Sequence, residues 1–201
     1  MTVIRFLLLG LLFNINQTLI AQDPLILSNY STHTIYSDTL GEERTYWISL
    51  PASYSDKHKD YKRYPVLILL DGHIHFEAIN GILNFMSGVR NRERQVPEMI
   101  VIGMMNVNRE RDFTPDKIIT KRINSTGGGN RFLAFLEKEL IPKIDNQYRS
   151  MPYRLLFGHS LGGLITAHAY LQPNSIFNAF IAVDPSFGTC LLYTSPSPRD
   201  S

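Results

Sequence analysis

The sequence has few of the residues that build disulfide-rich, metal-binding or nucleic-acid-binding proteins. Its single cysteine, Cys190, leaves the rest of the chain without a disulfide, a thiol nucleophile or a cysteine-based metal site. Charged residues make up 19% of the chain and the formal net charge is +2, so nothing indicates binding to nucleic acid or to a membrane surface. No histidine pair, carboxylate cluster or glycine-rich phosphate loop has the required spacing. We therefore expect no metal and no cofactor.

The sequence also lacks an apolar run long enough to cross a membrane, which needs roughly 20 residues. The apolar run at residues 6–13 is much shorter, follows a basic start and precedes a small-residue site at Ala21. This pattern predicts a secretory signal over residues 1–21, and hence a periplasmic or secreted protein with no membrane span after cleavage. No cysteine lies near Ala21, which argues against a lipid anchor. The alternative is a buried first strand or helix.

Residues 190–201 differ from the rest of the chain because they are rich in serine and proline and have no helical or strand period. We expect them to be a non-native tail, with a native disordered end as the alternative. The predicted organisation is then a signal at 1–21, one partial domain at 22–189 and the tail at 190–201. A hydrophobic content of 44% is sufficient for a packed core in that domain.

Apolar segments of strand type alternate with segments of helical period along the domain. Residues 31–36 and 43–50 alternate in polarity and predict an antiparallel hairpin, whereas the continuous apolar run 64–70 predicts a central, parallel strand. Helical spacing follows at 76–86, and a long amphipathic helix begins at Asn130, with a kink or break expected at Pro142. Further strands are predicted at 99–105, before Ser160 and at 176–183. The order predicts an α/β fold with a mostly parallel sheet.

The most informative stretch is the segment at residues 153–165, where an apolar strand stops at Gly-His-Ser-Leu-Gly and a helical run follows at once. This pattern predicts a sharp turn that places Ser160 in a strained conformation with its hydroxyl exposed. Gly158 and Gly162 are small, as the close approach of strand and helix requires. Ser160 is therefore the candidate nucleophile of an α/β-hydrolase. The alternative is a glycine-rich turn that holds a serine by chance.

Acyl transfer by a serine also needs backbone donors for the oxyanion, a base and an acid that orients the base. The expected donors are the N–H of Leu161 and, from the loop after the 64–70 strand, the N–H of His73. An ordinary turn at Asp71 is the alternative for that loop. No histidine follows His168, although the fold orders its triad as serine, acid and histidine. We expect the base and acid to lie beyond this chain, with Asp184 as a weaker candidate for the acid.

Two arginines lie in the polar segment 106–115, which is predicted to be a loop at the carboxyl end of a strand. In open α/β sheets this edge carries the ligand site. Arg109 and Arg111 are therefore candidates for binding a carboxylate or phosphate of the substrate. The alternative is a salt-bridged loop in which Asp112 is the partner.

Four segments, in this order, resemble one family, the putative esterases of the esterase D and enterochelin-esterase-like type. They are LLDG at 69–72, NRERDFTP at 108–115, FL at 135–136 with ELIP at 139–142, and GHSLGG at 158–163. The resemblance runs from about residue 31 to 186. It implies an α/β-hydrolase that is incomplete at its C-terminus and a carboxylic-ester hydrolase without a cofactor, with Ser160 as nucleophile. The family places its acid and histidine after the last residues seen here, so this chain is expected to be inactive as given.

The sequence thus predicts a serine esterase that forms an acyl-enzyme on Ser160 and takes a small-molecule ester as its substrate. Two alternatives remain: a non-catalytic binding protein on the same fold, and an acyltransferase. The predicted export argues against the cytosolic glutathione branch of the family. The sequence does not indicate the acyl or alcohol part of the substrate or the oligomeric state.

Overall fold

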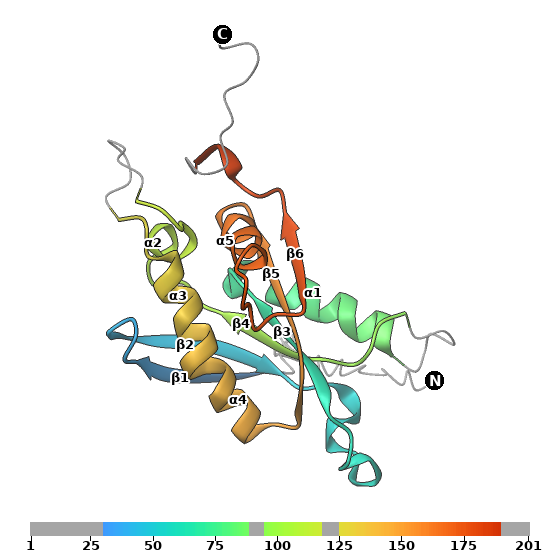
Figure 1. The fold of residues 1–201 in the computed structure, drawn as a ribbon. Coiled ribbons are helices and arrows are strands. Elements are labelled where there is room, and N and C mark those ends of the chain that lie inside the picture. Colours follow the sequence, from blue (N-terminus) through green and yellow to red (C-terminus); the bar gives the residue numbers. More distant parts are fainter. Residues whose placement is uncertain (1–29, 89–94, 118–124, 190–201) are drawn as a thin grey trace, which may run out of the picture.

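A six-stranded mixed sheet forms the centre of the protein (Figure 1). The computed structural model describes residues 30–88, 95–117 and 125–189. The predicted signal at 1–21 and the predicted tail at 190–201 lie outside these residues. The strand order is β1-β2-β4-β3-β5-β6. The strands are β1 (Ser31–Ser37), β2 (Glu42–Ser49), β3 (Tyr64–Leu69), β4 (Ile100–Met104), β5 (Ser150–His159) and β6 (Ala179–Val183).

The strand directions agree with the predicted fold. β1 and β2 form the expected antiparallel hairpin, and β2 also pairs antiparallel with β4. The remaining pairs, β3 with β4, β3 with β5 and β5 with β6, are parallel. Tyr46 and Ile48 of β2 are buried, whereas Leu50 lies beyond the end of the strand and is exposed. The last strand is shorter than expected, because residues 176–178 precede β6.

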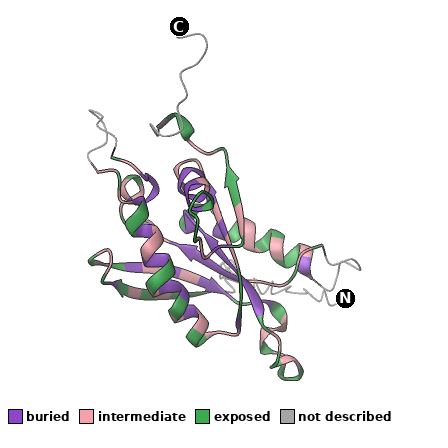
Figure 2. Ribbon diagram, in the orientation of Figure 1, coloured by how far each residue is buried: buried purple, intermediate pink, exposed green. Residues whose placement is uncertain are grey.

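β3 is buried along its whole length because helices cover both faces of the sheet at this point (Figure 2). Val66 and Ile68 pack into a core with the helices after residue 129, while Leu67 and Leu69 pack with Phe76 on the opposite face. Alternate side chains of a strand point to opposite faces, so a strand with two covered faces needs a continuous apolar run. The run at residues 64–70 meets this requirement.

One helix covers the face of the sheet that carries Leu67 and Leu69, and a set of helices covers the opposite face (Figure 1). α1 (Gly72–Ser87) packs against β4 and begins four residues earlier than predicted. On the other face lie α3 (Gly129–Phe135), α4 (Ile141–Gln147) and α5 (Leu161–Tyr170). This arrangement places α1 and α5 after neighbouring strands, so that both helices begin at the same edge of the sheet.

The long helix changes its geometry next to Pro142, where a kink or break was expected. Between α3 and α4 lies a π-helical turn, η3 (Leu136–Leu140), in which the N–H of Ile141 donates to the carbonyl of Leu136. A proline inside a helix removes one N–H and crowds the carbonyl one turn back. The wider π turn immediately before Pro142 accommodates that crowding, and a second short helix, α4, begins at Ile141 with Pro142 in its first turn.

The polar segment 106–115 contains a short helix, α2 (Arg109–Phe113), and is not entirely a loop as predicted. The side chain of Asn108 caps α2 by accepting a hydrogen bond from the N–H of Arg111. Asp112 is buried and bonds Arg44 of β2 at 2.6 Å, and both side chains are 1% exposed. Because a buried charge is costly without its partner, this ion pair fixes α2 on the sheet.

We predict that Phe135→Ala lowers the free energy of unfolding by about 3–5 kcal/mol, because this ring is fully buried in α3 and its removal leaves a cavity. Phe85→Ala is the matched control, since Phe85 of α1 is 70% exposed. Its expected effect is below about 1 kcal/mol. Urea denaturation followed by circular dichroism measures both changes. Equal losses in the two variants would contradict the assignment of the core.

Candidate active site

Four parallel strands bring their carboxyl ends to one edge of the sheet. Asp71 follows β3 after one residue, Asn106 follows β4, Ser160 follows β5 directly and Asp184 follows β6. In open α/β sheets, ligands bind in the crevice outside this edge. Three of these residues, Asp71, Ser160 and Asp184, have positive φ, so the chain turns sharply as it leaves three neighbouring strands.

Ser160 lies in the strained turn that the sequence predicts. Its backbone has φ 57° and ψ −117°, a conformation that non-glycine residues rarely adopt. The turn needs glycine at Gly158, where a Cβ would lie 2.0 Å from the carbonyl oxygen of Gly162. At Gly163 a Cβ would lie 2.9 Å from the carbonyl oxygen of Val183. Close contact between β5, α5 and β6 therefore creates the turn.

The Ser160 hydroxyl contacts a residue that the sequence analysis missed. Its Oγ lies 3.0 Å from the Oγ of Ser186, and the N–H of Ser186 donates to the carbonyl of Ser160 at 3.1 Å. Within residues 30–88, 95–117 and 125–189, this hydroxyl makes no hydrogen bond to a histidine. Ser186 had a sequence signal, because it lies three residues after an apolar strand at the same edge as Ser160.

The two predicted oxyanion donors occupy the first turns of two helices. Leu161 is the first residue of α5, and His73 is the second residue of α1. His73 was expected in a loop, but the helix begins at Gly72 because Asp71 already makes the turn with φ 53°. The first N–H groups of a helix have no partner within that helix and carry the positive end of its dipole. Both N–H groups thus have the chemistry of an anion-binding site, and their role as donors stays a prediction.

Asp71 is the most heavily hydrogen-bonded acid near this edge. It is fully buried and accepts from Arg109 Nε at 2.7 Å, Arg109 Nη2 at 2.9 Å and Asn106 Nδ2 at 2.5 Å. Burial by itself raises the pKa of Asp71, but the hydrogen bonds from Arg109 and Asn106 lower it below its ordinary value. Asp71 is therefore a carboxylate at neutral pH. Its turn holds an ion pair in which the carboxylate is buried and the Arg109 side chain is 28% exposed.

The two candidate substrate-binding arginines both have partners within the protein. The guanidinium of Arg109 binds Asp71 and also donates to the carbonyl of His159 at 3.3 Å. Arg111 pairs with Glu42 at 2.5 Å and with Asp112 at 2.8 Å. The ion pair with Asp112 is the one that the alternative interpretation named. Binding of substrate by either arginine stays a prediction.

The histidines near the edge pack against one another. The ring of His75 lies 5.5 Å from that of His159, measured between centroids, and 6.2 Å from that of Phe157. Burial lowers the pKa of His75, an effect that the nearby Asp71 carboxylate opposes. His168 lies further along α5, where its Nε2 is 2.8 Å from Oδ1 of Asn130 and burial lowers its pKa. His168 is thus a packed residue.

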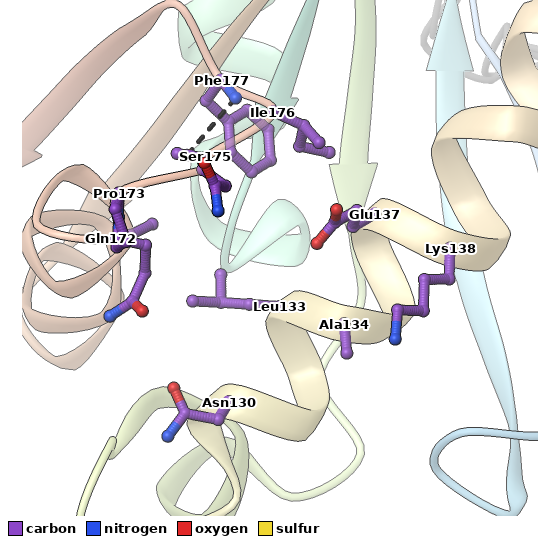
Figure 3. A pocket seen from close by; sticks show the side chains of 12 residues that line it. Asn130, Leu133, Ala134, Glu137, Lys138, Gln172, Pro173, Ser175, Ile176 and Phe177 are labelled. Carbon is purple, nitrogen blue, oxygen red and sulfur yellow. Dashed lines mark hydrogen bonds between the residues drawn. The ribbon is translucent and has the colours of Figure 1, made fainter.

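A pocket of about 400 Å³ lies between α3 and the loop after α5 (Figure 3). Leu133 and Glu137 line one side, and Gln172 and Phe177 line the other. This pocket is at the C-terminal end of α5, whereas Ser160 precedes its N-terminus, about 15 Å away along a ten-residue helix. The pocket therefore does not include the candidate nucleophile.

The described residues hold no group of three or more histidine, cysteine, aspartate or glutamate side chains arranged to bind a metal ion. In the same part of the chain, no helix is both long enough and apolar enough to span a membrane.

Known proteins resemble this chain in both sequence and structure. A ferri-bacillibactin esterase of Bacillus subtilis, BesA, is 30% identical over 138 residues, which are 61% of this chain and 48% of the relative. An apo-salmochelin esterase of Escherichia coli is 27% identical over 140 residues, 62% of this chain and 42% of the relative. The crystal structure of an IroE-like serine hydrolase from Shewanella oneidensis is 37% identical, with a TM-score of 0.71, over 79% of this chain and 51% of that one.

This chain spans about half the length of the curated relatives it matches. A family model described as "Putative esterase" matches residues 37–191, which include every strand after β1, both helices that begin at the site and Ser160 itself. The family predicted from the four sequence segments is confirmed. The chain belongs to the Putative esterase family.

Proposed function

We propose that Ser160 is the nucleophile of a serine esterase and that the reaction passes through an acyl-enzyme on its hydroxyl. The observation that carries this proposal is the backbone of Ser160, held at φ 57° between a strand and a helix that touch at Gly158 and Gly162. Such strain persists only where the surrounding structure maintains it, and it is frequent at catalytic residues. The positive end of α5 begins at the next residue, where it favours developing negative charge.

In the proposed reaction, the Oγ of Ser160 attacks the ester carbonyl and the carbonyl oxygen becomes an oxyanion. The N–H groups of Leu161 and His73 donate hydrogen bonds to that oxyanion, which lowers the barrier because these donors are already oriented. As the carbon–oxygen bond to the alcohol breaks, the alcohol oxygen takes up the proton that the Ser160 hydroxyl has lost, and the acyl group stays on Ser160. Water then hydrolyses the acyl-enzyme.

We further propose that the substrate is an ester of a siderophore or a closely related small molecule. Support comes from relatives whose names state this activity: a ferri-bacillibactin esterase, an apo-salmochelin esterase and a siderophore triacetylfusarinine C esterase from Aspergillus fumigatus. The last is 25% identical over 182 residues. A hydrolysis assay with ferri-bacillibactin, salmochelin and p-nitrophenyl acetate tests this proposal, with the siderophores expected to give the higher kcat/KM.

Ser160→Ala is expected to lower kcat by about 10⁴-fold or more in the full-length protein, because no other group at the site can take the place of the nucleophile. Ester hydrolysis under steady-state conditions measures the loss. Ser175→Ala serves as the control, since this serine lies in the loop after the far end of α5. An unchanged rate in Ser160→Ala would rule out the acyl-enzyme at this residue.

A non-catalytic binding protein is the alternative that the contact between the hydroxyls of Ser160 and Ser186 favours, because a nucleophile needs a base. A fluorophosphonate probe separates the two functions. Rapid labelling that is lost in Ser160→Ala supports the esterase, whereas absence of labelling supports the binding protein. An acyltransferase would instead give an acylated product when an alcohol or sugar acceptor is added.

We also propose that the protein is exported, on the basis of the basic start, the apolar run at 6–13 and the small-residue site at Ala21. The expected mature protein begins at Gln22 and occurs in the periplasm or outside the cell. N-terminal sequencing of protein recovered from each cell fraction tests this. Ala21→Leu should block cleavage, because the cleavage site requires a small residue. A mature chain that still begins at Met1 would overturn the proposal.

A further inference from the structure

One guanidinium connects two of the sharp turns at the edge of the sheet. Arg109 Nε and Nη2 bind the two carboxylate oxygens of Asp71, at 2.7 and 2.9 Å. The same Nη2 donates to the carbonyl of His159 at 3.3 Å. Arg109 therefore contacts the chain that leaves β3 and the chain that leaves β5. A two-pronged contact of this kind fixes orientation as well as distance.

The peptide between His159 and Ser160 is held on both sides. Its carbonyl accepts from Arg109 at 3.3 Å, and its N–H donates to the carbonyl of Val183 at 3.0 Å. With both polar groups bonded to different elements, the plane of this peptide cannot rotate without the loss of a hydrogen bond. The next bond, between N and Cα of Ser160, has the strained φ of 57°. The two hydrogen bonds thus maintain the strain at the nucleophile.

Asp71 transmits the position of Arg109 to the start of α1. Its own carbonyl accepts from the N–H of Ile74 at 2.9 Å and of His75 at 3.1 Å, which closes the first turn around His73. The first turn of α5 lies against the same carboxylate, because a Cβ at Gly162 would be 3.3 Å from Asp71 Oδ2. The two helix starts that carry the proposed oxyanion donors therefore meet at Asp71.

Arg109 is itself held in place by its short helix. α2 is fixed to β2 by the buried pair of Asp112 and Arg44, and the guanidinium of Arg109 lies 5.5 Å from the centre of the Phe113 ring. Asn106, at the end of β4, donates from its Nδ2 to Asp71 Oδ1, the oxygen that Arg109 Nε also binds. The network consequently joins the ends of β3, β4 and β5, and through Val183 also β6.

We propose that Arg109 is a positioning residue that holds the Ser160 turn and the first turn of α1 in fixed relation, so that nucleophile and oxyanion donors face one reacting carbonyl. This inference rests on the function proposed for Ser160. Arg109 acts through the peptide of residues 159 and 160 and through Asp71, and does not touch the reacting atoms. Its Nε and Nη2 are already bonded to Asp71 and to the carbonyl of His159.

Substitution of Arg109 tests this role in the protein encoded by the full gene. Arg109→Met should lower kcat about 100-fold with KM changed less than about 3-fold, because small displacements of reacting groups cost about this much. Arg109→Lys keeps the charge but loses the two-pronged contact, and should remain impaired at least about 10-fold. A residue that binds substrate would instead raise KM and leave kcat unchanged.

A double variant separates positioning from stability. Arg109→Met leaves Asp71 buried without its main partner, so Asp71→Asn/Arg109→Met removes both charges and avoids that cost. The matched controls are Arg154→Met and Asp145→Asn/Arg154→Met, which break an ion pair of 2.6 Å far from the turns. The controls should keep kcat within about 3-fold. The double variant at Arg109 should stay folded and still lose kcat about 100-fold.

Amide hydrogen exchange gives a second reading that does not depend on activity. Exchange at Ser160, Leu161 and His73 should accelerate at least about 10-fold in the double variant at Arg109 and stay unchanged in the double control, after correction for global stability. Unchanged kcat together with unchanged exchange would overturn the positioning role while the esterase stands. An inactive wild-type enzyme that Ser160→Ala does not alter would instead overturn the proposed function, and altered exchange would then still show that Arg109 holds the turn.

Discussion

The contact between β5 and α5 is the constraint on which the site depends. The two elements approach so closely at Gly158 that a single added carbon would lie 2.0 Å from the carbonyl oxygen of Gly162. This approach leaves the connecting residue only one route, through a positive φ, and that residue is Ser160. The strain of the turn is thus a consequence of packing.

A second constraint is the disposition of buried charge beneath this turn. Asp71 is fully buried and ionised, so the fold must supply donors to it from several elements at once. Asn106 comes from the end of β4 and Arg109 from α2, which explains why the site includes this polar segment. The polar network orients the turns, and the buried strands and helices fix where the turns lie.

Much of the fold follows from local patterns because each pattern has a single physical solution. The alternation at 31–36 and 43–50 gives a hairpin with one covered face, and the apolar run at 64–70 gives a strand covered on both faces. At Pro142, where a kink or break was expected, a π-helical turn precedes the proline and a second short helix, α4, begins at Ile141. α2 was missed because five polar-rich residues have little helical period, and a buried ion pair with Arg44 holds them in place.

For the site, the sequence by itself determined the family, the turn and Ser160, because glycine spacing between a strand and a helix is a local requirement that leaves a local signal. The tertiary structure alone decided the other partners: Ser186 against the hydroxyl, Asn106 and Arg109 on Asp71, and Glu42 on Arg111. These pairs bring together residues that are distant along the chain. Which charges meet at the edge of a sheet depends on strand order and register, and no spacing within the sequence records them.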